Sequence, residues 1–309
     1  GDRLNIVMES DDSNCLYGFY SDRFEAVGPQ HGVQSVTLTA QPGNLTSLTN
    51  GSGVYTINSI DTGLCTVAPS KAYWTFDPIS TTVNVVAGVT TTQVDFYGTV
   101  STVPGIAFAK SLPDGEEVLL PPMVVTAGTA QISGAFYIEE ANRTTGIRVA
   151  TSESIDRGDL VTVRGILRTD ACERYIEAVD ITIVSAGAQI PDPIGFNGAS
   201  LGGGPLAPYV PGVTGSQGAN NVGLLVRTWG RVRSLGTNCF YIDDGSRMPP
   251  PASGEVLVKV SCPPGISIPD VGWYVAVTGI CSSELSGADC IRVVRVRDDD
   301  DLDLLLVPR

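Results

Sequence analysis

The residues best suited to chemistry in this sequence form a row of basic and aromatic side chains near position 230. Arg227, Trp229, Arg231 and Arg233 alternate with other residues, so a strand here places all four on one face. Basic residues interleaved with an aromatic on a small barrel are typical of proteins that bind single-stranded nucleic acid. Exposed arginines also pair with acidic groups across subunit contacts. The row is therefore a candidate face for an anion or for a protein partner.

The charge balance of the chain argues against nucleic acid. The sequence holds 19 basic and 33 acidic residues, for a net charge of −14, and such a surface repels polyanions. The acid run Asp298–Asp301 follows directly after Arg297. We therefore rank nucleic acid below an acidic protein neighbour as the partner of the arginine row.

No catalytic constellation is predicted. A serine, cysteine or threonine nucleophile needs a positioned base, and the one histidine, His31, lies in a predicted turn. The pairs Glu139-Glu140 and Asp243-Asp244 supply adjacent carboxylates, but neighbouring strand residues point to opposite faces, so neither pair converges on a substrate as in a glycosidase. We expect these acids to end strands at solvated turns, in a non-catalytic protein without a cofactor.

The seven cysteines favour disulfides over a metal site. The single histidine is far from any cysteine, which leaves a zinc site short of ligands. The acid run with Asp303 lacks the glycine turn and ligand spacing of a calcium loop. Disulfides in an oxidising compartment are the favoured alternative to buried thiols. The expected pairs are Cys281–Cys290, Cys239–Cys262 and Cys15–Cys65, with Cys172 left over.

An internal repeat indicates how these side chains are positioned. The segment 135–140 (AFYIEE) recurs at 239–244 (CFYIDD), and 159–166 corresponds to 273–280. Further on, 174–179 corresponds to 289–294. A repeat of this length means one supersecondary plan used twice. Each copy is a set of short alternating strands separated by turn residues, which suits a small barrel.

Composition and turns predict an all-β chain. It contains 35 Gly and 20 Pro, with abundant Thr and Val and few helix-forming stretches. We expect a β-sandwich followed by two β-barrels. The predicted segments are an N-terminal apolar strand at 1–13, a seven-stranded sandwich at 14–100, a first barrel at 101–186, a Gly/Pro-rich but ordered strap at 187–221, a second barrel at 222–299 and a C-terminal strand at 300–309.

The sandwich segment resembles carboxypeptidase-regulatory-like domains, which are transthyretin-like. The resemblance covers nearly all of 14–100 and implies a sandwich fold and no activity. The segments that carry it are LYGFYSD at 16–22, GVQSVTLT at 32–39, NGSGVYTI at 50–57, DTGLCTV at 61–67, PSK at 69–71, WTFDP at 74–78 and VDF at 94–96.

The repeated segments resemble the OB-fold domains of bacterial extracellular proteins. In the first copy the pattern runs from FYI and two acids through GIRV at 146–149 to GDLVTVRG at 158–165 and YIEA at 175–178. In the second copy ANNVGLLV at 219–226 and GRV at 230–232 carry the resemblance. It implies two OB-like barrels in tandem.

Both ends of the chain carry an apolar strand outside an otherwise complete domain. Leu4, Ile6 and Met8 alternate at one end, and Leu302, Leu304 and Leu306 alternate at the other. Such strands must pair with a sheet edge, in their own molecule or in a neighbour. The last residues, LVPR at 306–309, also match the remnant of a thrombin-cleaved tag.

Three sequons lie in predicted turns, at Asn44, Asn50 and Asn142, and are candidate glycosylation sites. No run of 18 apolar residues occurs, so no membrane span is predicted. Together with the expected disulfides, these features favour an extracellular or cell-surface protein.

These observations predict a structural subunit of an extracellular filament or surface assembly. It would polymerise with copies of itself, head to tail, because the terminal strand of one molecule completes a sheet in the next. The alternatives are a glycan-binding or adhesion module with an aromatic patch and, less favoured, a binder of single-stranded nucleic acid.

Overall fold

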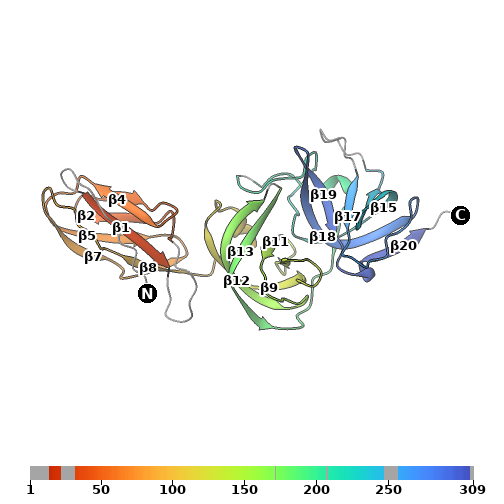
Figure 1. Cartoon of the computed structure of the whole chain (residues 1–309), viewed down its shortest axis with the longest axis horizontal. Helices are drawn as coiled ribbons and strands as arrows, with labels where there is room; N and C mark the ends of the chain where they lie inside the picture. The colour runs from red at the N-terminus through yellow and green to blue at the C-terminus, as the bar shows by residue number, and fades with distance from the viewer. Residues whose placement is uncertain (1–13, 22–31, 171, 207, 247–256, 307–309) are drawn as a thin grey trace. The chain divides into compact units, whose positions relative to one another are not determined.

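The computed structural model describes residues 14–21, 32–170, 172–206, 208–246 and 257–306. Its regular structure is almost entirely β, with the one α-helix of the described residues at α1 (Ile106–Lys110), which confirms the predicted fold class (Figure 1). None of the helices in these ranges has the length and apolar character needed to span a membrane. The chain divides into two compact units, Gly1–Thr102 with Gly115–Glu117, and Val103–Asp114 with Val118–Arg309.

Unit 1 contains two four-stranded sheets with the orders β4-β1-β8-β6 and β3-β2-β5-β7. The described residues of this unit therefore form eight strands, where the sequence predicted seven. Buried and accessible residues alternate along Thr37–Gln41, Val54–Asn58 and Phe96–Val100, because successive side chains point to opposite faces. The strands are β1 (Asn14–Ser21), β2 (Thr37–Gln41), β3 (Leu45–Leu48), β4 (Val54–Asn58), β5 (Gly63–Ser70), β6 (Trp74–Asp77), β7 (Thr81–Val85) and β8 (Phe96–Val100).

The first part of unit 2 is a closed five-stranded barrel, barrel 1, with the order β10-β11-β13-β12-β9. The β9–β10, β10–β11 and β12–β13 pairs are antiparallel, and the β11–β13 pair is parallel. The core of barrel 1 includes Phe136, Ile138 and Ile176. The strands are β9 (Glu117–Ala127), β10 (Ala135–Glu139), β11 (Gly146–Ala150), β12 (Leu160–Asp170) and β13 (Glu173–Ser185).

The second barrel of unit 2, barrel 2, has the same strand order, β15-β16-β17-β19-β18, closed by a β15–β18 pairing. The parallel pair also recurs, as β17 with β19. Two further strands, β14 and β20, extend this sheet at its ends. The strands are β14 (Ile194–Gly195), β15 (Leu225–Gly236), β16 (Cys239–Asp243), β17 (Val258–Ser261), β18 (Tyr274–Ser286), β19 (Asp289–Arg295) and β20 (Leu302–Leu306).

The strand registers correct the end of the predicted repeat. In barrel 1 Leu167 pairs with Ile176, and in barrel 2 Cys281 pairs with Val294. Ile176 therefore corresponds to Val294 and not to Ile291, three residues away. Beyond these equivalent pairs the hairpin continues for three residue pairs in barrel 1 and for five in barrel 2. Matching residues by type therefore gave the wrong register for the last strand.

The Gly/Pro-rich strap between the barrels is ordered and packs on barrel 2. β14 pairs in parallel with Val226 and Arg227 of β15, and Leu201 is fully buried in the core of barrel 2. The strap contains a 3₁₀ helix, η1 (Gly198–Ser200), whose first N–H, that of Gly198, donates to Asp244 Oδ2 at 2.7 Å. Leu206 and Tyr209 remain exposed.

The disulfide pattern differs from the predicted one. Cys172, in the β12–β13 turn of barrel 1, bonds to Cys290 of β19 in barrel 2, whereas Cys172 was expected to be unpaired. Cys281 lies opposite Val294, and Cys290 lies opposite Leu285, so the β18–β19 register keeps these two cysteines apart. Cys239, Cys262 and Cys281 are buried free thiols, and Cys65 is also buried. The side chain of Cys15 lies outside the described residues.

The filament prediction has a terminal strand pairing with a neighbouring molecule, but the C-terminal strand pairs within its own chain. β20 pairs antiparallel with Tyr274–Val277 of β18 in the same chain, and Leu302 packs against the core of barrel 2. Leu304 and Leu306 are more than half exposed. The N-terminal residues Leu4, Ile6 and Met8 lie outside the described residues.

Because the Cys172–Cys290 bond closes a loop of 118 residues, we predict that Cys172→Ser/Cys290→Ser lowers the stability of unit 2 by about 4 kcal/mol. Urea unfolding under non-reducing conditions measures this change. Wild-type protein in reductant is the control and should match the variant. An unchanged unfolding midpoint would contradict the prediction.

Candidate functional site

The chemistry-bearing side chains of unit 2 gather where the two barrels meet, a region we call the joint. It is formed by the outer face of β10 in barrel 1 and by β15, β18 and β19 in barrel 2. All five residues of β10 are buried, whereas the corresponding strand β16 leaves Tyr241 and Asp243 partly accessible. A strand whose two faces are both buried has a partner on each side, so barrel 2 covers the outer face of β10.

Tyr137 is the central residue of the joint. Its ring packs with Ala127, Leu225 and Ile280 in an apolar cluster drawn from both barrels. Its hydroxyl donates to the carboxylate of Glu173, with Oη–Oε1 and Oη–Oε2 distances of 3.0 and 3.2 Å. Ser282 of barrel 2 donates to the same carboxylate at 3.1 Å. The buried carboxylate of Glu173 thus accepts hydrogen bonds from one side chain of each barrel.

Cations on both sides compensate for the charge of Glu173. Arg148 Nε lies 3.6 Å from Glu173 Oε2, and its guanidinium stacks on Tyr175. In barrel 2, Arg295 donates from Nε to Ser282 Oγ at 3.0 Å and from Nη2 to Glu284 Oε1 at 3.1 Å.

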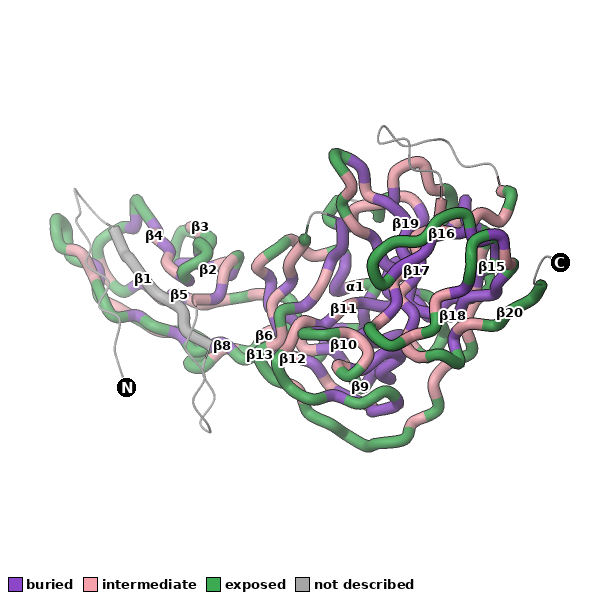
Figure 2. The backbone as a smooth tube through the Cα atoms, turned by 45° about the vertical axis from the view of Figure 1, so that its right-hand side comes forward, coloured by how far each residue is buried: buried purple, intermediate pink, exposed green. Residues whose placement is uncertain are grey.

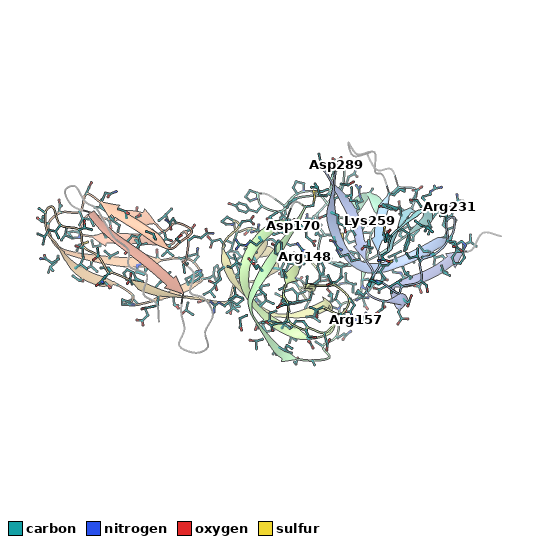
Figure 3. The ribbon with its side chains drawn as sticks, in the orientation of Figure 1. Arg148, Arg157, Asp170, Arg231, Lys259 and Asp289 are labelled. Carbon is teal, nitrogen blue, oxygen red and sulfur yellow. A yellow bond between two sulfur atoms is a disulfide. The ribbon has the colours of Figure 1, made fainter. Side chains whose placement is uncertain are left out.

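The ion pairs continue outward from the joint on both barrels. Lys259 Nζ bonds to Glu284 at 2.5 Å in barrel 2, and Arg148 lies 3.6 Å from Asp170 in barrel 1. Figure 3 labels Lys259, Arg148 and Asp170. One network of alternating charges therefore links the two barrels.

Burial shapes the acid–base properties of this centre. It raises the pKa of Tyr137, and the neighbouring Glu173 raises it further. Burial also raises the pKa of Glu173, an effect that Arg148 and Arg295 oppose. A phenol with a raised pKa is a poor base or nucleophile at neutral pH. The centre is therefore suited to holding the barrels together rather than to moving protons.

Glu139 forms a second polar contact across the joint. Its Oε2 accepts the backbone N–H of Leu225 at 2.7 Å, while Oε1 has no hydrogen-bond partner among the described residues. Burial raises the pKa of Glu139 to about 7. The expectation that Glu139 ends its strand at a solvated turn is therefore wrong, because barrel 2 covers the end of β10.

Backbone contacts complete the joint. A Cβ on Gly146 would lie 2.1 Å from the carbonyl oxygen of Gly223, and a Cβ on Gly223 would lie 2.4 Å from the carbonyl carbon of Gly146. Only glycine allows this approach. Nearby, the buried Lys110 donates to Val222 O at 2.9 Å, and burial lowers the pKa of Lys110 to about 8.

The other acids of the two carboxylate pairs also support the fold. Glu140 Oε1 accepts the N–H of Ile106 at 2.8 Å, at the start of α1. Asp243 accepts from Gly245 N and Arg233, and these two hydrogen bonds lower its pKa. Asp244 holds the strap through Gly198. Neither pair converges on a common point.

The predicted arginine row lies on the outer face of β15. Arg227, Trp229, Arg231 and Arg233 alternate with the buried residues Val226, Thr228, Gly230 and Val232. Arg227 pairs with Asp303 and Arg233 pairs with Asp243, each at 2.5 Å, so acids of the same barrel neutralise these two. Arg231 Nε donates to the carbonyl of Gly272 at 3.4 Å. Two further arginines of barrel 2 lie elsewhere, Arg295 in the joint and Arg297 against Asp301.

An aromatic patch remains between these ion pairs. Trp229 is 50% exposed and Tyr274 of β18 is 40% exposed. Trp229 pairs with Ala276, and Arg231 pairs with Tyr274, so the two rings are diagonal neighbours on one face with a small residue beside them. We call Trp229, Arg231, Tyr274 and Ala276 the outer patch.

The C-terminal acid run takes part in local structure. Asp301 is buried and accepts three hydrogen bonds from Arg297, and Asp298 pairs with Arg157 of barrel 1 at 2.5 Å. Asp299 Oδ1 accepts the N–H of Ser267. Among the described residues, no cluster of three or more His, Cys, Asp or Glu side chains is arranged to hold a metal ion.

The three sequon asparagines, Asn44, Asn50 and Asn142, all lie in exposed positions. Asn50 accepts backbone N–H groups of Ser52 and Val54, and Asn142 accepts from Thr144. Their side chains therefore stabilise turns. His31 lies outside the described residues.

Comparison with known proteins gives no identification. No protein-family model matches the sequence, and no curated protein matches it. A structure of a murine DNA-binding protein bound to double-stranded DNA aligns with 56% of this chain and 94% of its own, at 10% identity and a TM-score of 0.28. The TIE protein of Bacillus anthracis aligns with 93% of this chain and 49% of its own, at 8% identity and a TM-score of 0.25. At these TM-scores the likenesses support no argument about function.

The sequence did not reveal the joint. Glu173 and Ser282 are far apart in the chain and carry no motif, so no local pattern connects them. The repeat places Tyr137 and Tyr241 at the same position of the two copies, and nothing in their local sequence shows that only Tyr137 is fully buried.

We predict that Tyr137→Phe destabilises unit 2 by about 1–3 kcal/mol, because it leaves the buried Glu173 carboxylate without one of its donors. Urea unfolding measures the change. Tyr274→Phe, which removes a hydroxyl from an exposed ring, is the matched control and should have little effect. Equal effects of the two substitutions would show that the Tyr137 hydroxyl contributes nothing specific.

We predict that Glu139 makes unit 2 less stable as pH rises from about 4.5 to about 7, because burial raises its folded-state pKa from the ordinary 4.5 to about 7. The folded protein binds the proton more tightly than the unfolded chain, so this contribution favours folding below pH 4.5 and is lost above 7. Glu139→Gln mimics the protonated form. Its stability relative to wild type should rise by up to about 3 kcal/mol between pH 4.5 and 7.5, and a pH-independent difference would contradict this.

Proposed function

We propose that the protein is a non-catalytic structural subunit of an extracellular filament or surface assembly. The observation that carries the proposal is the joint, where the polar side chains of unit 2 bind the two barrels to each other. Tyr137 and Glu173 are buried there, so a substrate has no access to them. Two barrels held rigidly together in this way suit a subunit from which a larger assembly is built.

The disulfide supports the extracellular part of the proposal. Cys172–Cys290 connects the two barrels, and such bonds form and persist in oxidising compartments. The exposed sequon asparagines are compatible with attached glycans, which mass spectrometry of native material would reveal.

The barrels' topology supports the OB-like assignment, and it also disfavours nucleic-acid binding by barrel 1. A five-stranded barrel of this class presents the face of its second and third strands to its ligand. In barrel 1 those strands are β10 and β11, and barrel 2 covers the face of β10. In barrel 2 the arginines at either end of the candidate row, Arg227 and Arg233, are paired with acids.

A glycan-binding or adhesion protein is the second candidate, and the outer patch favours it. Trp229 and Tyr274 supply exposed rings beside the Arg227–Asp303 pair. Aromatic faces with neighbouring polar groups can receive a sugar ring. Retention on a glycan array that Trp229→Ala abolishes would support this candidate.

Electron microscopy and light scattering of the purified, oxidised full-length protein test the proposed function. We expect filaments or ordered oligomers whose amount increases with protein concentration. A protein that remains monomeric at high concentration, and that binds a glycan through Trp229, would replace the structural proposal with the adhesion candidate.

A further inference from the structure

β20 leaves one side of the barrel 2 sheet open. It pairs with Tyr274–Val277 of β18 and is the last strand in the sheet order. On its other side it has no strand partner in the described part of the chain. An open edge presents a row of backbone N–H and C=O groups, which can pair with a strand from another molecule.

The side chains of β20 do not protect this edge. Leu304, Leu305 and Leu306 are 52%, 56% and 59% exposed, and Figure 2 shows most of β20 in the exposed colour. Proteins commonly protect an edge with charged side chains. The single charge of β20, Asp303, is paired with Arg227 at 2.5 Å, which leaves three consecutive exposed leucines.

The open edge continues into the outer patch. Leu306 pairs with Tyr274, which in turn pairs with Arg231, so one cross-strand row runs from the edge to the face. Trp229 is the diagonal neighbour of Tyr274 in this row. Tyr, Trp and Arg are the residues that most often dominate binding energy at protein interfaces. The edge and the patch together form a surface suited to strand addition, in which backbone pairing supplies affinity and side-chain contacts supply specificity.

We propose that β20 is an acceptor edge and that its occupant is the N-terminal segment of a second copy of this chain. This inference rests on the proposed structural function and names its contact. Residues 1–13 lie outside the described residues and lead directly into β1. Within them Leu4, Ile6 and Met8 alternate with other residues, which is the pattern of a strand with one apolar face. Cross-strand apolar pairs with the leucines of β20 would stabilise the added strand.

This contact joins two different surfaces of the molecule. The donor precedes the sandwich of unit 1, and the acceptor belongs to barrel 2 of unit 2. A contact between unlike surfaces propagates from copy to copy unless the rotation closes a ring. The role expected for the C-terminal strand is thus reversed: β20 receives a strand and does not donate one.

Two full-length variants test the proposal separately. Leu304→Lys/Leu306→Lys places charges on the acceptor, and Leu4→Lys/Ile6→Lys/Met8→Lys places charges on the donor. Each should raise the concentration at which half the protein is assembled by about thirtyfold or more, as measured by light scattering. Leu235→Lys/Leu285→Lys is the matched control, since these leucines of barrel 2 are 50% and 56% exposed and lie on other strands. It should assemble like the wild type.

Mixing the two variants provides the decisive result. The donor-defective variant keeps an intact acceptor, and the acceptor-defective variant keeps an intact donor, so the mixture should form a one-to-one complex that does not grow further. A mixture that stays monomeric overturns the proposal. A second measurement, binding of a labelled peptide of residues 1–13 to each protein, tests the acceptor edge without requiring assembly. Wild type and the Leu235→Lys/Leu285→Lys control should bind it, and equal binding by the acceptor variant would also overturn the proposal.

The outcomes separate this inference from the proposed function. If wild type assembles and the acceptor variant assembles equally well, the contact is wrong while the structural function stands. If wild type is monomeric at all concentrations, both fail. Loss of glycan retention in the acceptor variant without any change in assembly would assign the surface to a glycan and overturn the strand-addition proposal.

Discussion

The structure of unit 2 depends on one constraint: the carboxylate of Glu173 is buried and must keep its donors. Tyr137 and Ser282 supply hydrogen bonds to it from opposite barrels, and Arg148 and Arg295 compensate its charge. A buried carboxylate left without partners costs several kcal/mol. The barrels therefore cannot separate without exposing this group to water or leaving it unpaired.

The same constraint explains why two similar barrels have different surfaces. Tyr137 and Tyr241 occupy corresponding positions and pair with Arg148 and Lys259 respectively. In barrel 1 this face became an internal contact, closed by glycines and a disulfide. In barrel 2 the corresponding face remains partly accessible, and the sheet is extended by β14 and β20. The two barrels share a fold because the sequence repeats. Their surfaces differ because barrel 2 covers this face of barrel 1, while the corresponding face of barrel 2 stays partly accessible.

Much of the fold followed from local patterns, because alternation and turn residues are local properties. The all-β class, the internal repeat and the outward row from Arg227 to Arg233 are of this kind. The sequence did not predict the joint, the Cys172–Cys290 bond or the burial of Glu139. These features depend on contacts between the barrels that join residues more than 80 positions apart, and a periodic sequence pattern does not reveal such contacts. The pairing of Cys281 with Cys290 failed for a related reason, since closeness in sequence did not reveal the register of the β18–β19 hairpin.

The cooperative joint is the central claim, and native-state hydrogen exchange of the full-length, oxidised protein tests it most directly. The amides of β10 and β18 should lose protection together as denaturant is added, with one common free energy of opening. If β18 and the rest of barrel 2 open at a lower denaturant concentration while β10 stays protected, the barrels are independent. The joint would then not be the contact on which unit 2 depends.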